Sequence, residues 1–100
     1  MDKNAALKIA ERYIKIIRSK YQVETAYMFG SYAKGTNHND SDIDLAIVFN
    51  QVDDIIDMQI ELMKMRTDDI LMIEPHPFVK KDFNSFDPIV SEIMKYGMKL

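Results

Sequence analysis

The feature that most constrains this chain is the segment MFGSYAKGTNHNDSDIDLAIVF, residues 28–49. An apolar run ends at Gly30-Ser31, a polar ten-residue gap follows, and Asp42 and Asp44 then lead into a second apolar run. Side chains two residues apart on a strand point to the same face, so we expect the two carboxylates on one face with their Cα atoms roughly 6.5–7 Å apart. The segment therefore predicts two strands joined by a tight corner, with a small-residue bend close to paired acids.

The residues before and within this segment predict two helices and two strands. A helix over residues 4–20 is indicated by apolar positions at the helical period, namely Ala6, Ile9, Ala10, Tyr13, Ile14 and Ile17. Residues 23–29 are rich in β-branched and aromatic side chains and predict a strand that ends at Gly30. A short helix is expected at residues 31–34. The nearly continuous apolar run at residues 43–49 predicts a central strand covered on both faces.

The second half of the chain predicts two more helices around a third strand. Asp53 is expected to cap a helix that reaches about residue 66, with Ile55, Ile56, Ile60, Leu62 and Met63 among its buried residues. Residues 70–73 predict a strand stopped by Pro75 and Pro77. The last helix is expected to begin at Asp87-Pro88 and to end at Gly97, with an apolar stripe of Ile89, Val90, Ile93 and Met94.

This element order, α-β-α-β-α-β-α, predicts an α/β (α+β) fold with a small mixed sheet of about three strands flanked by helices. Residues 1–100 are expected to form a single domain. The sequence has no cysteine and no apolar run that approaches the roughly 20 residues needed to span a bilayer, so a cytoplasmic location without a membrane partner is expected. The net charge of −3 and the pI near 5.3 argue against a nucleic-acid partner, which normally meets a basic face.

The Gly-Ser corner and the paired acids have the chemistry of a nucleotide site. Gly30 allows a phosphate to approach the backbone closely, and Ser31 offers its N–H and hydroxyl at the start of the short helix. Lys34 and Lys20 are further candidates for phosphate contacts, although solvated lysines are the simpler interpretation. Asp42 and Asp44 suit a pair of ions about 3.5–4 Å apart, as in two-metal phosphoryl transfer, and their hard oxygen ligands favour Mg²⁺.

A third acid is expected to complete the site, and Asp68, Asp69 and Glu74 are the candidates. If the third strand runs parallel to the second, its beginning lies beside Asp42 and Asp44, which favours Asp69 and leaves Glu74 as the alternative. Solvated acids at a strand entry, or an acid paired with a nearby cation, would account for these residues equally well. His76, held between two prolines, is a candidate contact for a phosphate or base.

The combination of Gly30-Ser31, Asp42-x-Asp44 and a later strand acid resembles the nucleotidyltransferase superfamily that includes DNA polymerase beta and kanamycin nucleotidyltransferase. The chain is most similar to its minimal, single-domain branch, the MNT proteins. The resemblance implies transfer of AMP from ATP to a hydroxyl, with Asp42, Asp44 and the third acid as catalytic and metal-binding residues, two Mg²⁺ ions as cofactors, and Gly30, Ser31 and Lys34 at the phosphates. It also implies an antitoxin that modifies a tyrosine of a HEPN-domain toxin.

Two other functions remain open at this point. The chain could be an antitoxin without catalytic activity that acts by masking its partner, or an enzyme that modifies a small molecule such as an antibiotic together with a partner subunit. A polymerase is the weakest alternative because of the acidic charge. Either a homo-oligomer or a hetero-oligomer is compatible with the sequence.

Overall fold

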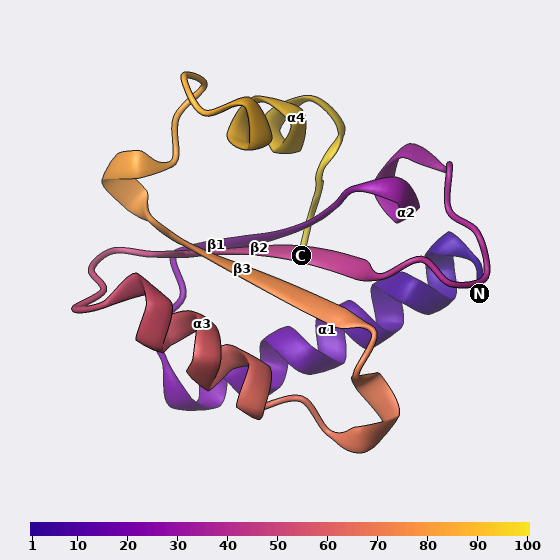
Figure 1. Ribbon diagram of the computed structural model, residues 1–100, viewed down its shortest axis with the longest axis horizontal. Coiled ribbons are helices and arrows are strands. Elements are labelled where there is room, and N and C mark those ends of the chain that lie inside the picture. Colours follow the sequence, from indigo (N-terminus) through magenta and orange to yellow (C-terminus); the bar gives the residue numbers. More distant parts are fainter.

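The computed structural model describes residues 1–100 as a mixed four-stranded sheet with helices on both faces, in the strand order β3-β2-β1-β4 (Figure 1). The strands are β1 Thr25–Phe29, β2 Ile43–Phe49, β3 Ile73–Val79 and β4 Met98–Lys99. β1 is antiparallel to both β2 and β4, whereas β3 is parallel to β2. The expected α/β fold with a small mixed sheet is confirmed, and the short β4 is a strand that the sequence did not predict.

The helices divide between the two faces of the sheet. They are α1 Lys3–Lys20, α2 Ser31–Lys34, α3 Ile55–Lys64 and α4 Pro88–Tyr96, with the 3₁₀ turns η1 Asp68–Ile70 and η2 Lys80–Asp82. α1 and α3 lie on one face, α4 lies over the other, and the short α2 stands at one end of the sheet (Figure 1). None of these helices has the length and apolar character that a crossing of the bilayer requires.

Helices α3 and α4 each begin directly after an aspartate whose side chain accepts hydrogen bonds from free backbone N–H groups of the first turn. Asp87 accepts a hydrogen bond from the Ile89 N–H at 2.9 Å at the start of α4, as predicted, and Gly97 ends that helix. The predicted cap of α3 was wrong by one residue. Asp54, not Asp53, caps α3, because its backbone is extended and its carboxylate accepts from the N–H groups of Ile56 and Asp57.

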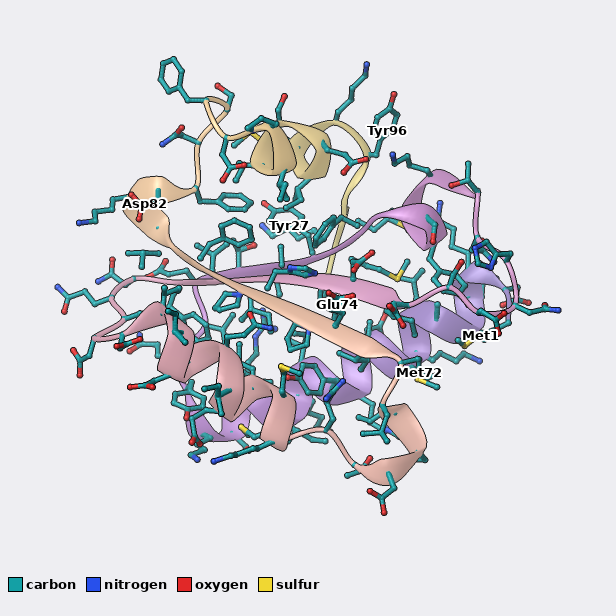
Figure 2. The ribbon with its side chains drawn as sticks, in the orientation of Figure 1. Met1, Tyr27, Met72, Glu74, Asp82 and Tyr96 are labelled. Carbon is teal, nitrogen blue, oxygen red and sulfur yellow. The ribbon has the colours of Figure 1, made fainter.

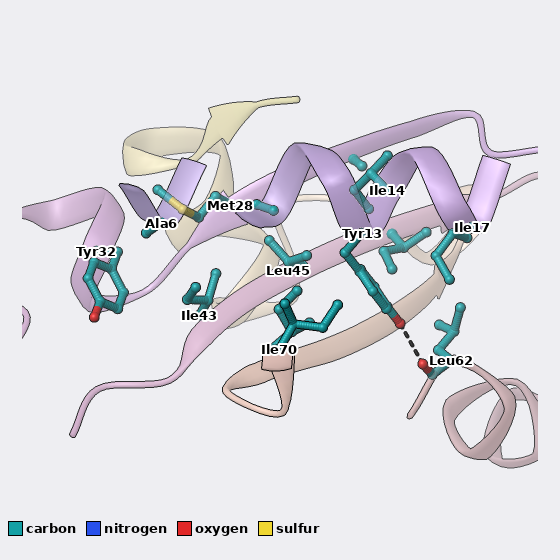
Figure 3. Packing of buried hydrophobic residues seen from close by; sticks show 14 of the residues in the cluster. Ala6, Tyr13, Ile14, Ile17, Met28, Tyr32, Ile43, Leu45, Leu62 and Ile70 are labelled. Atoms are coloured by element: carbon teal, nitrogen blue, oxygen red, sulfur yellow. Dashed lines mark hydrogen bonds between the residues drawn. The ribbon is translucent and has the colours of Figure 1, made fainter. Parts of the chain in front are cut away.

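The main core lies between the sheet and the face that α1 and α3 cover. The predicted stripe of α1 is confirmed, with Ala6, Ala10, Tyr13, Ile14 and Ile17 buried and Ile9 half-buried. Figure 3 shows Tyr13 reaching from α1 to α3, where its hydroxyl donates to the Leu62 carbonyl at 2.6 Å. Burial raises the pKa of the Tyr13 phenol well above its usual range, so the hydroxyl keeps its proton and remains a donor.

The apolar stripes predicted for α3 and α4 are only partly buried. On α3, Leu62 is buried, whereas Ile56 is 70 % exposed and Ile55, Ile60 and Met63 are each at least 41 % exposed. On α4, Val90 and Ile93 are buried but Ile89 and Met94 are exposed. The prediction failed for α3 because this helix packs at the margin of the sheet, against the edge strand β3, and only one narrow side of it is covered.

The third strand also differs from the prediction. Residues 68–70 form the turn η1, and β3 begins only at Ile73 and continues through Pro75 and Pro77. Both prolines are tolerated because β3 is an edge strand and alternate residues face away from β2. The side chain of Gln59 donates to the Pro75 carbonyl on that outer side at 2.7 Å.

Replacement of Tyr13 by phenylalanine should lower the free energy of unfolding by about 0.5–1.5 kcal/mol, because the buried Leu62 carbonyl loses the hydrogen bond from the Tyr13 hydroxyl and keeps only that from the Met65 N–H. Urea denaturation followed by circular dichroism measures this change. Tyr96→Phe is the matched control, since Tyr96 is 45 % exposed and its loss of the hydroxyl should shift stability by less than about 0.5 kcal/mol. Equal midpoints for the two variants would contradict the structural role given to the Tyr13 hydroxyl.

Candidate functional site

Gly30 forms the corner between β1 and α2 and lies directly against Asp44. Its backbone angles, φ 76° and ψ −151°, belong to a region that only glycine adopts readily. A Cβ atom at this position would collide with the Asp44 carboxylate. The antiparallel register explains the contact, because Phe29 is the direct partner of Asp44. The predicted bend against an aspartate is therefore present.

The parallel pairing of β2 with β3 brings two more polar side chains to Asp44. Glu74 is the register partner of Asp44, and His76 is the partner of Ala46. The three residues lie on the same face of the sheet because each is two positions from the next along its strand or directly across from it. Ligand atoms of Asp44, Glu74 and His76 all lie within 4.8 Å of one another, and the His76 Nε2 lies 3.3 Å from the Asp44 Oδ1. Figure 2 shows Glu74 beyond Met72 along β3, and Asp82 past the opposite end of the strand.

The cluster of Asp44, Glu74 and His76 is accessible but sheltered on one side. The side chains of Asp44 and His76 are 25 % and 31 % exposed, and the edge of the His76 ring meets the Phe29 ring at a centroid distance of 5.1 Å. No lysine or arginine forms an ion pair with Asp44 or Glu74. Two adjacent carboxylates without a lysine or arginine partner favour the binding of a divalent cation, and their oxygen atoms are the donors that Mg²⁺ prefers. The residues present thus fit a metal site.

Asp42 and Ser31 flank this cluster without being part of it. Asp42 is exposed, immediately precedes β2 and forms no ion pair. Ser31 is half-buried and is the first residue of α2. Both therefore lie at the same end of β1 and β2 as the contact between Gly30 and Asp44.

The structure does not bring Asp69 to the cluster. Asp69 is exposed on η1, where it accepts a hydrogen bond from Thr67 and forms an ion pair with Arg12 at 2.7 Å. These hydrogen bonds, from Thr67 first and then Arg12, hold the pKa of the Asp69 carboxyl below its usual value. The preference for Asp69 depended on a strand that begins near residue 70. The parallel arrangement on which that preference was conditional is present, but because β3 begins at Ile73, the acid beside Asp44 is Glu74.

The two lysines that were candidates for phosphate contacts both have acidic partners. Lys34 forms an ion pair with Glu92 of α4 and lies over the ring of Tyr96. The hydrogen bond and charge of Glu92 raise the pKa of Lys34. Lys20 lies 3.7 Å from Glu61. Both lysines are therefore already paired with a glutamate.

The contact between His76 and Asp44 is a feature that sequence reasoning missed. The available signal was the spacing of two residues between Glu74 and His76, which places both side chains on one face of a strand. The two prolines concealed it because they had been interpreted as the end of that strand.

The largest hollow on the surface lies elsewhere, past the far ends of β2 and β3. Its volume is about 840 Å³, and its lining includes Asn50, Asp53, Lys81 and Asp82. This hollow is shallow and open, and the corner at Gly30 does not line it. Its aspartates do not belong to a group of side chains close enough to share a metal ion. The cluster at Asp44 is the better candidate site because its donor atoms converge.

The family model "Polymerase beta, Nucleotidyltransferase" matches residues 11–98. This match covers most of the chain, and the chain therefore belongs to the polymerase beta nucleotidyltransferase family. Two proteins of Methanocaldococcus jannaschii, both named "Putative protein adenylyltransferase", are each 30 % identical to this chain over 82 residues. In both cases the match covers 73 % of this chain and 82 % of the relative.

Solved structures share the fold at lower identity. A "putative nucleotidyltransferase" from Sulfolobus solfataricus superposes with a TM-score of 0.72 at 20 % identity, covering 97 % of this chain and 80 % of that one. A chain of the toxin–antitoxin complex MntA–HpeT, in a mutant form, gives a TM-score of 0.66 at 24 % identity, over 91 % of this chain and 70 % of that one. A toxin–antitoxin structure with AMP-PNP gives 0.61 at 22 % identity, over 89 % and 69 %.

Replacement of Gly30 by alanine should displace the Asp44 carboxylate and lower stability by about 1–3 kcal/mol, because the new Cβ collides with Asp44 and the backbone angles are unfavourable for alanine. Gly35→Ala is the matched control. Gly35 also has a φ of 76°, but a Cβ there meets nothing within 4 Å. Urea denaturation should show a smaller loss for Gly35→Ala, and a loss equal to that of Gly30→Ala would argue against the contact with Asp44.

Proposed function

We propose that this chain transfers AMP from ATP to a hydroxyl of a partner protein, namely a tyrosine of a HEPN-type toxin, and acts as its antitoxin. The observation that carries the proposal is the convergence of Asp44, Glu74 and His76 beside the glycine corner at Gly30. Relatives named as protein adenylyltransferases support a protein as the acceptor. The similar fold of toxin–antitoxin structures, one of them with an ATP analogue, supports the nucleotide and the partner.

The glycine corner is suited to the triphosphate. Because Gly30 has no Cβ, the Asp44 carboxylate can lie directly against the corner, so a cation held by Asp44 would be close to phosphate oxygens bound at the corner backbone. Ser31 adds its N–H and hydroxyl as donors at the first turn of α2. Lys34 can contribute only by exchanging its partner Glu92 for a phosphate.

The carboxylates hold the cofactor in this proposal. Asp42, Asp44 and Glu74 are oxygen donors suited to Mg²⁺, which would neutralise negative charge on the triphosphate when bound there. Without a cation, Asp44 and Glu74 repel each other as register partners on adjacent strands. The fold thus holds two acids side by side, and a bound cation would relieve their mutual repulsion.

The reaction is a substitution at the α-phosphorus of ATP. The acceptor oxygen forms a bond to that phosphorus, the bond from it to the bridging oxygen of the β-phosphate breaks, and pyrophosphate leaves. The proton of the acceptor hydroxyl goes to a carboxylate, for which Glu74 is our choice because it is more exposed than Asp44 and lies beside it. Asp69 cannot take this role without leaving its partners Arg12 and Thr67.

The surroundings of the cluster suit a protein acceptor. A shallow hollow of about 310 Å³ is lined by Ile55, Ile56, Gln59, His76, Pro77 and Phe78. It therefore continues from the cluster to the exposed apolar side of α3, where Ile56 is 70 % exposed. Exposed apolar surface next to a polar site is typical of a protein-binding region.

The double substitution Asp42→Asn and Asp44→Asn should abolish transfer, with a loss of at least about 100-fold, while the fold is kept because both side chains are accessible. Incubation with ATP labelled at the α-phosphate and with the protein that copurifies with the chain, followed by mass spectrometry of that protein, measures the transfer. Normal transfer by the double variant would refute the assignment. Loss of transfer with full neutralisation of the toxin in cells would support masking instead of modification as the antitoxin mechanism.

Glu74→Gln and Asp69→Asn distinguish the two candidates for the third acid. Glu74→Gln should reduce the transfer rate by at least about 100-fold, because the residue beside Asp44 loses its charge. Asp69→Asn should keep the rate within about threefold, since Asp69 is exposed and its contacts are with Arg12 and Thr67. The opposite pattern in the same labelled-ATP assay would assign the role to Asp69.

A further inference from the structure

An imidazole nitrogen faces the carboxylates at the candidate metal site. His76 Nε2 lies 3.3 Å from Asp44 Oδ1, and the cluster formed by these two residues and Glu74 is the one group of the structure whose donor atoms are close enough to share an ion. The ring is held in place from two sides. Pro75 and Pro77 fix the backbone around it, and its face neighbour Phe29 meets it edge-on at 5.1 Å.

The distances suit ligands of one cation. Two donors that are each about 2.1–2.2 Å from an ion and at right angles are about 3.0 Å apart, and donors on opposite sides are about 4.3 Å apart. The separation of 3.3 Å between His76 Nε2 and Asp44 Oδ1 is close to the right-angle value, and the limit of 4.8 Å for the whole cluster is slightly above the value for opposite donors. The separation of 3.3 Å is long for a hydrogen bond to a carboxylate, for which about 2.7–2.9 Å is typical.

We propose that His76 is a metal ligand, and that it makes the position at Asp44 and Glu74 a mixed nitrogen and oxygen site, which adds affinity for transition-metal ions of the Mn²⁺ to Zn²⁺ series to a position that the carboxylates alone would offer to Mg²⁺. Imidazole binds these ions more strongly than it binds Mg²⁺, which prefers oxygen ligands and retained waters. The ion binds the lone pair of Nε2, so His76 coordinates in the tautomer that carries its proton on Nδ1. The inference rests on the proposed function, because it concerns the same carboxylates.

Mn²⁺ is a suitable probe because it is paramagnetic. The chain without a histidine tag has two histidines, His38 and His76, and His38 is in the loop before β2 with its Nδ1 facing the Asp40 N–H. Electron spin-echo envelope modulation of the Mn²⁺ complex detects a coordinated ¹⁴N nucleus. The nitrogen modulation should be present in the wild type and in His38→Gln, and absent in His76→Gln.

Affinity gives a second measurement. Mn²⁺ is titrated into the protein, and the free ion is measured by its electron paramagnetic resonance signal. The Mn²⁺ affinity should be at least about tenfold lower in His76→Gln and unchanged in His38→Gln, because loss of even an outer-shell partner usually costs tenfold or more. Competition with Mg²⁺ should show less than about a threefold change in Mg²⁺ affinity for either variant. Circular dichroism checks that His76→Gln is folded, and the wild-type spectrum tests the proposal without any variant.

The outcomes separate this inference from the proposed function. Bound Mn²⁺ without nitrogen modulation in the wild type, or with modulation that persists in His76→Gln, overturns the role of His76 and leaves the carboxylate site intact. Unchanged Mn²⁺ affinity in the double variant Asp44→Asn and Glu74→Gln overturns the metal site itself and the proposed function with it. Failure of the wild type to bind Mn²⁺ or Mg²⁺ overturns both.

Discussion

The register between β1, β2 and β3 is the constraint on which the site depends. It places Gly30 against Asp44 on one side and Glu74 beside Asp44 on the other. Apolar residues fix this register, because Met28, Leu45 and Ile73 are fully buried on the opposite face. A slip of one residue would turn those side chains to solvent and drive the carboxylates into the core. The same hydrophobic free energy that folds the sheet therefore brings together two acids that repel each other.

Helices cover the two faces of the sheet to different extents. α1 and α3 cover one face and form the larger apolar cluster, whereas α4 covers only part of the other through Val90 and Ile93. The uncovered part of that second face holds the metal-ligand cluster. The ion pair between Lys34 and Glu92 connects α2 to α4 across the rim of this area, so the corner helix is held near the site by a charge contact that a phosphate could compete with.

Sequence reasoning succeeded where local chemistry decides the structure. The capping of α4 by Asp87, the corner at Gly30 and the central position of β2 follow from short-range rules and were predicted. It failed where contacts with residues distant in the sequence determine the structure. The exposure of Ile56 depends on α3 meeting only the sheet margin, and the extent of β3 depends on its being an edge strand that tolerates prolines. For the candidate site, the contact between the corner at Gly30 and Asp44 was predicted from the sequence. The position of Glu74 beside Asp44 and the approach of His76 depend on where β3 begins, because pairing across strands cannot be read from one strand alone.

The prolines of β3 have a consequence for how this molecule can associate. On the open side of the strand, Pro75 and Pro77 offer no N–H donors, and the carbonyls of Ile73 and Pro75 are already bound by Arg66 and Gln59. An edge strand of this kind cannot pair with a further strand. Neither a second copy nor an extended peptide can therefore extend the sheet at β3, and edge-to-edge aggregation is blocked there. A protein that meets the chain beside the site must recognise it through side chains.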